Sequence, residues 1–582
     1  INMQNCFTFA PTGATVGITN SYYLSKIGNA NQGTARSDAE FRNGTVCNAL
    51  NDGNNGNIVW YHYGDNPGKD YPILVGYVWA GKSSGALWSD ASNWRRGVVP
   101  TLTSQPAYSS VIIPSGNLNP TNFSEDFYPH VTGTQGVKAI DIRSSAVVYV
   151  DGDNAKLNAN TINNAGFLKL STTGEVIAQS LSNATPTSQV IMEGESHLLV
   201  EGSFVNRGEL PRYGILLSDS ACMEIKGDLK NEIYSDKFNV DHYPYVHIVD
   251  DARLIVGGNT TNPGTMTIEG RSQTTFEGSV TTTRTLTVKG NAQVTFDDDL
   301  NINKGTFTLK GLTTMTTNGD INNSATLQVN YGDDYNAGAD SPNFLINGSS
   351  PENVTVERSL MANTIYYTGS ATEERKMNEG YTIGTDYNSY FDSGAEKFIT
   401  SSGIARFQGG NRYAACTVGL AGVAGTSHTL IQKGTLHPNE AYRNSLLDGW
   451  NWLNNPYPFT VAAKDGLLPL DVDMPLSDDE GVAPTVWVRS NGGNGSFDFM
   501  TYNAYTDVVA NGNDGAKYIA PFQDYCIYVN KADTYTFYPA VQIGENQSLL
   551  KASRLEMPKE IARLRISTDG KEEFDDEAVV VM

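Results

Sequence analysis

The segment 286–305 reads LTVKGNAQVTFDDDLNINKG, and related segments follow one another about every 20 residues between Val147 and Asn330. Its neighbours read MTIEGRSQTTFEGSVTTT (266–283) and FTLKGLTTMTTNGDINNSA (307–325). Self-similarity at a fixed period is typical of repeat architectures. The nine units begin at Val147, Phe167, Val190, Ile215, Val246, Met266, Leu286, Phe307 and Leu327, so the steps are 20, 23, 25, 31, 20, 20, 21 and 20 residues.

Every unit has the same plan. Two runs of alternating residues are separated by a small polar turn, and the unit closes on Asn with Gly nearby, as in NRG (206–208) and NPG (262–264). Alternation with a period of two residues predicts strands with one buried face. Asn and Gly favour turns that need positive φ. The segment is therefore expected to consist of short strands and tight turns only.

A single unit cannot bury its apolar stripe, whereas stacked units bury it against their neighbours. We therefore predict an all-β chain built on a right-handed parallel β-helix, with a coil rise of about 4.8 Å. The alternative is an antiparallel sandwich, in which strands and turns also recur every 8–12 residues or so. Similarity between whole units, and not only between turns, favours the solenoid.

Composition restricts the classes of partner. The 582 residues include 57 Gly and 30 Tyr, and the formal net charge is −23. Such an excess of negative charge argues against nucleic acid and anionic membranes as partners. No apolar run reaches the length of a membrane span. Since both ends of the sequence look cut, we expect the chain to be part of a longer protein.

The first part of the chain resembles the closing segment of GLUG-type repeat proteins, which are surface proteins of Bacteroidota and other bacteria. The matching residues are Tyr22-Tyr23-Leu24, Gly44, Leu50-Asn51, Trp60-Tyr61, Gly64, Asp70, Tyr71-Pro72 and Leu74. Ser37 and Glu40 have the spacing of a capping box for a short helix. We assign residues 1–78 to the end of a GLUG-type repeat region.

Residues 79–136 form a Trp-rich module that looks like one found in adhesin-like Bacteroidota proteins. The match comprises Trp79, Gly81, Trp88, Ala91, Asn93, Trp94, Gly97, Pro100, Val111, Ile113 and Pro114. The aspartate that the pattern has before its VxIP stretch is a serine here. Trp79, Trp88 and Trp94 are expected either to cap the apolar end of the solenoid or to form a platform on which sugars stack.

The longest step contains an insertion between Leu229 and Val246, within the parallel β-helix that we assign to residues 137–350. Loops that project from a scaffold are where binding residues tend to lie. Tyr234, His242, Tyr243 and Tyr245 are therefore candidate ligand-binding residues. The alternative is that these rings pack the loop onto the coils.

Two further candidates lie at predicted turns of the coils. Asp297, Asp298 and Asp299 offer the hard oxygen ligands that calcium prefers, although the spacing of known calcium solenoids is missing and a solvated turn is the alternative. We expect no cofactor other than this calcium. Asp219-Ser220-Ala221 matches a short O-glycosylation sequence of Bacteroidota, which makes Ser220 a candidate glycosylation site; the alternative is a plain turn.

Residues 351–582 resemble the C-terminal β-sandwich region of Bacteroidota proteins exported by type IX secretion. The stretch DGWNWLNNPYPFTV matches through Gly449, Trp450, Asn451, Leu453, Asn455, Pro456, Tyr457 and Pro458. A later strand matches through Ile519, Pro521, Gln523, Tyr525 and Val529. A Trp and a Pro of the usual pattern are absent near residue 360. We expect a β-sandwich here, ending in a hairpin that turns at Asp569-Gly570.

Together these features predict a non-enzymatic, adhesin-like or surface-layer protein, exposed on the outer membrane and part of a larger type IX-secreted chain. Its partners would be other surface proteins, copies of itself or host glycans. A carbohydrate-binding surface protein is one alternative. A β-helix polysaccharide lyase or hydrolase is another, but it would need clustered carboxylates with Arg or Lys nearby, and no such cluster is evident in the sequence.

Overall fold

The fold was analysed in a computed structural model of the chain. Two compact units are present, one of residues 1–287 with 296–298 and the other of residues 288–295 with 299–582. The structure describes residues 3–4, 7–8, 18–19, 22–24, 34–52, 60–61, 73–74, 77–81, 85–94, 97–103, 111–115, 127–209, 214–331, 341–349, 351–361, 365–372, 387–392, 394–395, 397–400, 416–419, 427–468, 481–491, 497–510, 516–540, 561–567 and 575–581.

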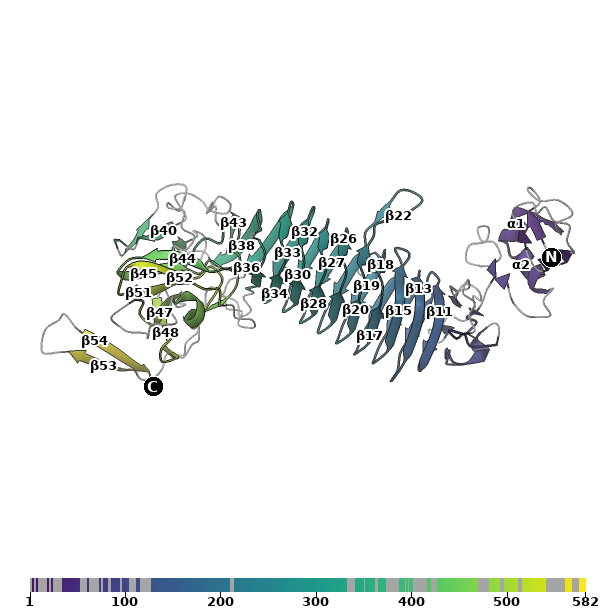
Figure 1. The fold of residues 1–582 in the computed structure, drawn as a ribbon, viewed down its shortest axis with the longest axis horizontal. Helices are drawn as coiled ribbons and strands as arrows, with labels where there is room; N and C mark the ends of the chain where they lie inside the picture. The colour runs from purple at the N-terminus through teal and green to yellow at the C-terminus, as the bar shows by residue number, and fades with distance from the viewer. Residues whose placement is uncertain are drawn as a thin grey trace. The chain divides into compact units, whose positions relative to one another are not determined.

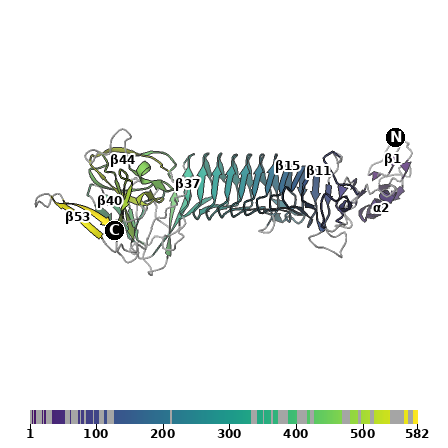
Figure 2. The ribbon, with the colours of Figure 1, turned by 90° about the horizontal axis from the view of Figure 1, so that it is seen from below.

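The chain is all-β, with 53% strand and 6% helix, and it contains a parallel β-solenoid of about nine turns. This confirms the predicted fold class. Figures 1 and 2 show the coils as a regular stack of short strands. Along these strands buried and partly exposed residues alternate, as in Phe167–Leu170 and Thr265–Ile268. The period-two pattern of the sequence is therefore the pattern of the solenoid core.

Two ladders of parallel strands form the coils. The first has one strand per coil and ends with an antiparallel partner, β43 (Ser427–Gly434). Its parallel strands are β10 (His130–Val131), β12 (Val147–Val150), β14 (Phe167–Leu170), β16 (Gln189–Met192), β19 (Gly214–Leu217), β24 (Tyr245–Ile248), β27 (Thr265–Ile268), β30 (Thr285–Val288), β33 (Thr306–Lys310), β36 (Thr326–Tyr331) and β38 (Val354–Met361).

The second ladder starts with long strands that later divide in two, because β15 pairs with both β17 and β18. The long strands are β11 (Thr134–Ile142), β13 (Lys156–Asn164) and β15 (Glu175–Asn183). The divided strands are β17 (His197–Val200), β18 (Phe204–Asn206), β20 (Cys222–Ile225), β21 (Leu229–Asn231), β25 (Arg253–Val256), β26 (Thr260–Asn262), β28 (Gln273–Phe276), β29 (Val280–Thr282), β31 (Gln293–Phe296), β32 (Leu300–Ile302), β34 (Thr314–Thr317), β35 (Ile321–Asn323) and β37 (Asn343–Ile346).

The register differs from the sequence alignment at one step. Val190 pairs with Ile215, and Ile215 with Val246, as predicted. Val190 also pairs with Leu168, however, and not with Phe167. Leu168 is fully buried whereas Phe167 points outward. The predicted alignment is therefore wrong by one residue between the second and third units, and such a shift exchanges the two faces of a strand.

Buried asparagines connect consecutive coils. Asn164, Asn183 and Asn206 each donate through Nδ2 to Oδ1 of the next asparagine, at 2.9, 3.0 and 2.9 Å, and the series ends at Asn231. The same amide nitrogens also donate to backbone carbonyls of the first ladder. Because buried polar groups must be hydrogen-bonded, this ladder explains why the units close on Asn.

Steric constraints explain why a glycine follows two residues after some of these asparagines. Gly166 and Gly208 donate their backbone N–H groups to the Oδ1 atoms of Asn164 and Asn206. A Cβ atom on Gly208 would lie 2.3 Å from the carbonyl oxygen of Ser188 in the preceding coil. The Asn-x-Gly closure thus combines a side-chain acceptor with a residue small enough for close backbone approach.

We expect Gly208→Ala to destabilise the solenoid by about 1–3 kcal/mol, the usual cost of forcing extra volume into a packed site. The loss would appear as a lower urea midpoint of the far-ultraviolet signal. Gly133→Ala is the matched control, because a Cβ at Gly133 has open space around it. If the Gly208 variant were as stable as the Gly133 variant, the neighbouring coil would accommodate the added methyl group at no cost in free energy. That result would contradict the steric explanation for the glycine.

The N-terminal residues contain α1 (Asp38–Arg42) and α2 (Thr45–Asp52). Ser37 and Glu40 form the predicted capping box at the start of α1. The described strands that precede β10 are β1 (Met3–Gln4), β2 (Phe7–Thr8), β3 (Ile18–Thr19), β4 (Tyr22–Leu24), β5 (Thr34–Arg36), β6 (Trp60–Tyr61), β7 (Ile73–Leu74), β8 (Tyr77–Val78) and β9 (Val111–Ile113).

The solenoid extends past the predicted domain boundaries at both ends. β8 and β9 continue the second ladder, because β8 pairs with β9 and β9 with β11. The boundary predicted at 136/137 falls inside β11, and the one at 350/351 precedes β38, which still pairs in parallel with β36. The Trp-rich module is thus joined to the ladder by main-chain hydrogen bonds.

The C-terminal residues form antiparallel sheets, and their arrangement as a β-sandwich stays a prediction. A five-stranded sheet has the order β45 (Gly449–Asn454), β51 (Asp524–Val529), β47 (Thr485–Asn491), β48 (Phe497–Asn503) and β49 (Val508–Ala510). A four-stranded sheet has the order β39 (Ile365–Tyr367), β42 (Cys416–Gly419), β40 (Tyr387–Asp392) and β41 (Lys397–Thr400). Smaller pairs join β44 (Tyr442–Leu446) to β52 (Asp533–Phe537), and β46 (Val461–Ala462) to β50 (Tyr518–Ile519).

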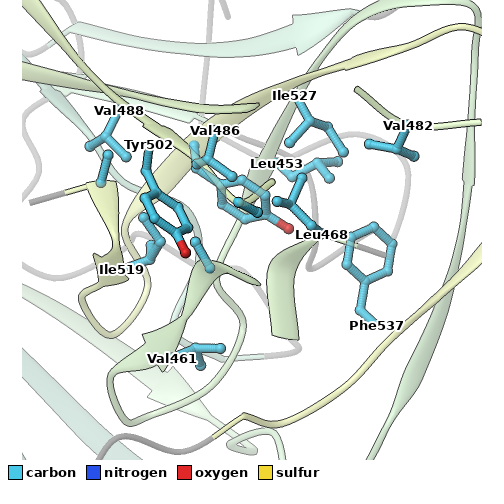
Figure 3. Close-up of a cluster of buried hydrophobic side chains, with 14 of the residues drawn as sticks. Leu453, Val461, Leu468, Val482, Val486, Val488, Tyr502, Ile519, Ile527 and Phe537 are labelled. Atoms are coloured by element: carbon cyan, nitrogen blue, oxygen red, sulfur yellow. The ribbon is translucent and has the colours of Figure 1, made fainter. Parts of the chain in front are cut away.

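One face of the five-stranded sheet covers a hydrophobic core. Leu453, Val486, Val488 and Ile527 point into it, as Figure 3 shows. The predicted terminal hairpin is present as β53 (Ile561–Ser567) paired with β54 (Asp575–Val581), and its expected turn lies outside the described residues.

A buried arginine lies where the last parallel strand meets the C-terminal sheets. Arg358 in β38 is 1% exposed, and its guanidinium lies 4.7 Å from the centroid of the Phe522 ring. It donates a hydrogen bond to the Thr368 hydroxyl. Burial lowers the pKa of Arg358 to about 10, so the group stays charged at neutral pH. We assign Arg358 a structural role at this junction.

Candidate functional site

The predicted insertion is a β-hairpin that projects from the coils, where Figure 1 labels β22. It pairs β22 (Tyr234–Ser235) with β23 (Asp241–His242) in antiparallel fashion. The Asp236 carboxylate closes the turn, because it accepts hydrogen bonds from the backbone N–H groups of Phe238 and Val240 at 2.8 and 2.9 Å. Phe238 at the tip is 73% exposed. The insertion is thus a locally ordered element and not an irregular loop.

His242 attaches the hairpin to the coils. Its Nδ1 lies 2.5 Å from a carboxylate oxygen of Glu209, and its Nε2 lies 3.8 Å from Asp236. The hydrogen bond to Glu209 is the main cause of a raised pKa at His242. A histidine with a raised pKa in the folded state stabilises that state in its protonated form.

We expect docking of the hairpin to depend on pH. The stabilisation from His242 is complete below the ordinary pKa of histidine and is lost as pH rises through its raised pKa. Amide exchange of residues 234–242, corrected for the intrinsic rate, should therefore be slower at roughly pH 5 than at roughly pH 8.5, on either side of histidine titration. Glu209→Gln should reduce this difference. Equal protection at both pH values would exclude the His242 contact as the attachment.

The other predicted aromatic residues of this region form two separate pairs. The Arg284 guanidinium lies 3.6 Å from the centroid of the Tyr243 ring. Tyr245 points outward from β24, and its ring centroid lies 5.9 Å from that of His247. The structure thus brings Tyr234 beside His242, at 6.1 Å between ring centroids, and gives Tyr243 and Tyr245 neighbours of their own. Ligand binding by these residues stays a prediction.

The three tryptophans of the Trp-rich module are brought together, but they are buried. Trp79, Trp88 and Trp94 are at most 1% exposed. Trp94 lies edge-on to both other rings, at centroid distances of 5.1 and 4.8 Å. Rings without an exposed face cannot stack on a sugar. The capping alternative is therefore the one that agrees with this geometry, and the predicted sugar-stacking platform is not present at these residues.

The predicted calcium and glycosylation residues lie at turns of the coils. A carboxylate oxygen of Asp298 accepts a hydrogen bond from the Ser279 hydroxyl at 2.8 Å, and Asp299 accepts one from the backbone N–H of Asp320 at 3.0 Å. Ser220 is exposed and follows Asp219, which has a φ of 55°. Neither observation tests metal binding or glycosylation, so both stay predictions.

The C-terminal sheet carries a surface that the sequence analysis did not identify. The outward side of β45, β47, β48 and β51 carries Trp450, Trp452, Trp487, Arg489, Phe499 and Tyr528, which we call the aromatic face. Within it, Phe499 is 45% exposed, Trp450 40% and Tyr528 36%. Clusters of exposed apolar rings on one surface mark interaction sites more often than scattered single residues do.

The rings of the aromatic face are held against one another. The Trp450 ring lies edge-to-face with Trp487 and Tyr528, at centroid distances of 4.9 and 5.2 Å. Arg489 lies over the Tyr367 ring at 4.7 Å and donates a hydrogen bond to the Tyr367 hydroxyl. The alternation Trp450-Asn451-Trp452-Leu453 is the sequence signal for this surface, since it separates two indoles from a core leucine.

Among the residues that the structure describes, no group of three or more His, Cys, Asp and Glu side chains is arranged to hold a metal ion. None of the described helices has the length and apolar character that crossing a membrane requires. Comparison of the chain with known protein families, with curated proteins and with solved structures gave no match.

Proposed function

We propose that this chain is a non-enzymatic, adhesin-like cell-surface protein, part of a larger chain exported by type IX secretion, in which the coils act as a spacer. The stack of about nine coils is the observation that carries the proposal. Main-chain ladders and buried asparagine amides join each coil only to its neighbours, an arrangement that makes repeat proteins extended scaffolds. The acidic composition favours the solubility of such a scaffold.

The accessibility of the chain on the outside of intact cells tests this proposal. We expect an antibody raised against the purified chain to label intact producing cells, and brief protease treatment of intact cells to remove the label while a periplasmic marker protein survives. Label that appears only after the cells are permeabilised would contradict a surface location. The purified chain should also release no reducing or unsaturated ends from polysaccharides, and release of either would favour the lyase or hydrolase alternative.

The aromatic face favours the second candidate function, a carbohydrate-binding surface protein. Its exposed rings lie on a sheet whose other side is a packed core. A surface adhesin and a carbohydrate-binding protein are compatible, because the coils would then present a binding surface. In this combined form the spacer and the binding surface belong to different parts of the chain and can be tested separately.

A further inference from the structure

We propose that the aromatic face binds neutral polysaccharides by stacking hexopyranose rings on Trp450, Trp487 and Tyr528. The inference deepens the carbohydrate-binding form of the proposed function and names the site and the class of ligand. It starts from exposure: Trp450 and Tyr528 are paired across neighbouring strands, and both are more than a third exposed. Leaving large rings in water is unfavourable, so a cluster of them calls for an explanation.

The two sides of this sheet differ in chemistry. The inward residues of the four strands are mainly aliphatic, such as Leu453, Val486 and Ile527. The described outward residues of β45, β47, β48 and β51 include no Leu, Ile, Val or Met. Aromatic residues and Arg are also enriched at protein interfaces, so self-association is one of the outcomes that the test distinguishes. Rings surrounded by polar side chains suit a ligand that is itself part apolar and part polar.

A hexopyranose has this character. Its ring C–H groups form an apolar patch and carry partial positive charge, while its hydroxyl groups point outward around the rim. The face of an aromatic ring carries partial negative charge and attracts such C–H groups. Thr485 and Asn503 lie on the same side of the sheet, where the Asn503 amide donates to the Thr485 hydroxyl at 3.2 Å. Arg489 lies beside Phe499, with its guanidinium donating to the Tyr367 hydroxyl. The face thus offers rings for stacking and polar groups for hydroxyls.

The rings are also preorganised. Trp450 is held by edge-to-face contacts with Trp487 and Tyr528, and the strands that carry them are hydrogen-bonded over a closed core. Little rotamer freedom is therefore lost on binding, which favours affinity. A second copy of the chain is a less suitable occupant, because two molecules of net charge −23 repel each other.

Native affinity electrophoresis of the purified chain tests the proposal, with soluble β-glucan, mannan, glucomannan and galactan as probes in separate gels. We expect at least one polysaccharide to retard the chain. Trp450→Ala and Tyr528→Ala should each weaken that retardation at least about tenfold, the effect of truncating a central ring in a binding site. Tyr538→Ala is the matched control: it removes a ring that is 52% exposed and lies outside both the aromatic face and the hairpin, and it should leave the retardation unchanged.

Three results would overturn the proposal. The first is the absence of retardation in all four gels, and the second is retardation that survives loss of both rings. The third is self-association in sedimentation velocity that Trp450→Ala abolishes, which would make the face a protein interface. Circular dichroism of the variants distinguishes loss of binding from loss of fold. Since the assay uses purified protein, its failure would leave the surface location of the chain untouched.

Discussion

Asn206→Ala is expected to destabilise the middle of the solenoid by at least about 3 kcal/mol, because three buried polar groups each lose a partner at about 1–3 kcal/mol. Asn183 loses the acceptor of one amide hydrogen, Asn231 loses the donor to its Oδ1, and Gly208 loses the acceptor of its backbone N–H. Water cannot replace these partners without entering the core, since Asn206 is fully buried.

This loss should be local before it is global. Stability in a stack of repeats is a sum of unit and interface contributions, so weakening one interface opens the coils on either side first. Amide exchange in β15, β18 and β21 should therefore rise more than exchange in the C-terminal sheets. The fall in the urea midpoint of the whole chain is the second readout.

Asn301→Ala is the matched control, since Asn301 accepts its hydrogen bond from Asn322 at the surface. Surface changes of this kind usually stay within about 0.5 kcal/mol. If the two asparagine variants had the same exchange and the same urea midpoint, the buried amides would not hold the coils together, and the repeated Asn would need another explanation.

Trp94→Ala is the second change with a large expected effect. Removing a fully buried Trp costs about 3–5 kcal/mol, and Trp94 contacts both other indoles of the module. Its Nε1 also donates to the carbonyl oxygen of Trp88 at 2.8 Å, so the substitution leaves a buried acceptor without its partner. The first coil of the solenoid should therefore fray.

The link from the module to the first coil defines the measurement. The backbone N–H of Trp88 donates to the carbonyl oxygen of His130, and that of His130 donates to Ala86. Amides of β10 and β12 should consequently exchange faster in Trp94→Ala than in the unmodified chain. Phe238→Ala removes an exposed ring from the same unit and should change neither strand. Unchanged protection of β10 and β12 would separate the tryptophans from any capping role.

Much of the fold could be predicted because the coil pattern is repeated. The alternation in segments such as Thr265–Ile268 determines which side chains are buried, and nine units confirm one another. The single error in register falls at Phe167–Leu170, where Phe167, Leu168 and Leu170 are all apolar. The alternating pattern therefore does not determine which face of that strand is buried. Only the pairing of Leu168 with Val190 shows that the face carrying Leu168 is the buried one.

The candidate binding surface was harder to predict for a related reason. Tryptophan in a buried cap and tryptophan on an exposed sheet look alike in sequence, so Trp94 was a candidate for sugar stacking while Trp450 was not. Their opposite exposures depend on neighbours distant in the chain, such as Tyr528 beside Trp450. The hairpin at Tyr234–His242 could be found because an insertion interrupts a regular period, and no comparable interruption marks the aromatic face.

Immunogold electron microscopy of producing cells, with an antibody against the purified chain, tests the central claim most directly. The account predicts gold outside the outer membrane. Gold in a regular lattice would identify an assembly protein, and its lateral contacts would be mapped next. Gold on single projecting stalks would identify an adhesin, and ligand binding would then be mapped at the aromatic face and the hairpin. Gold confined to the periplasm or the cytoplasm would contradict the account.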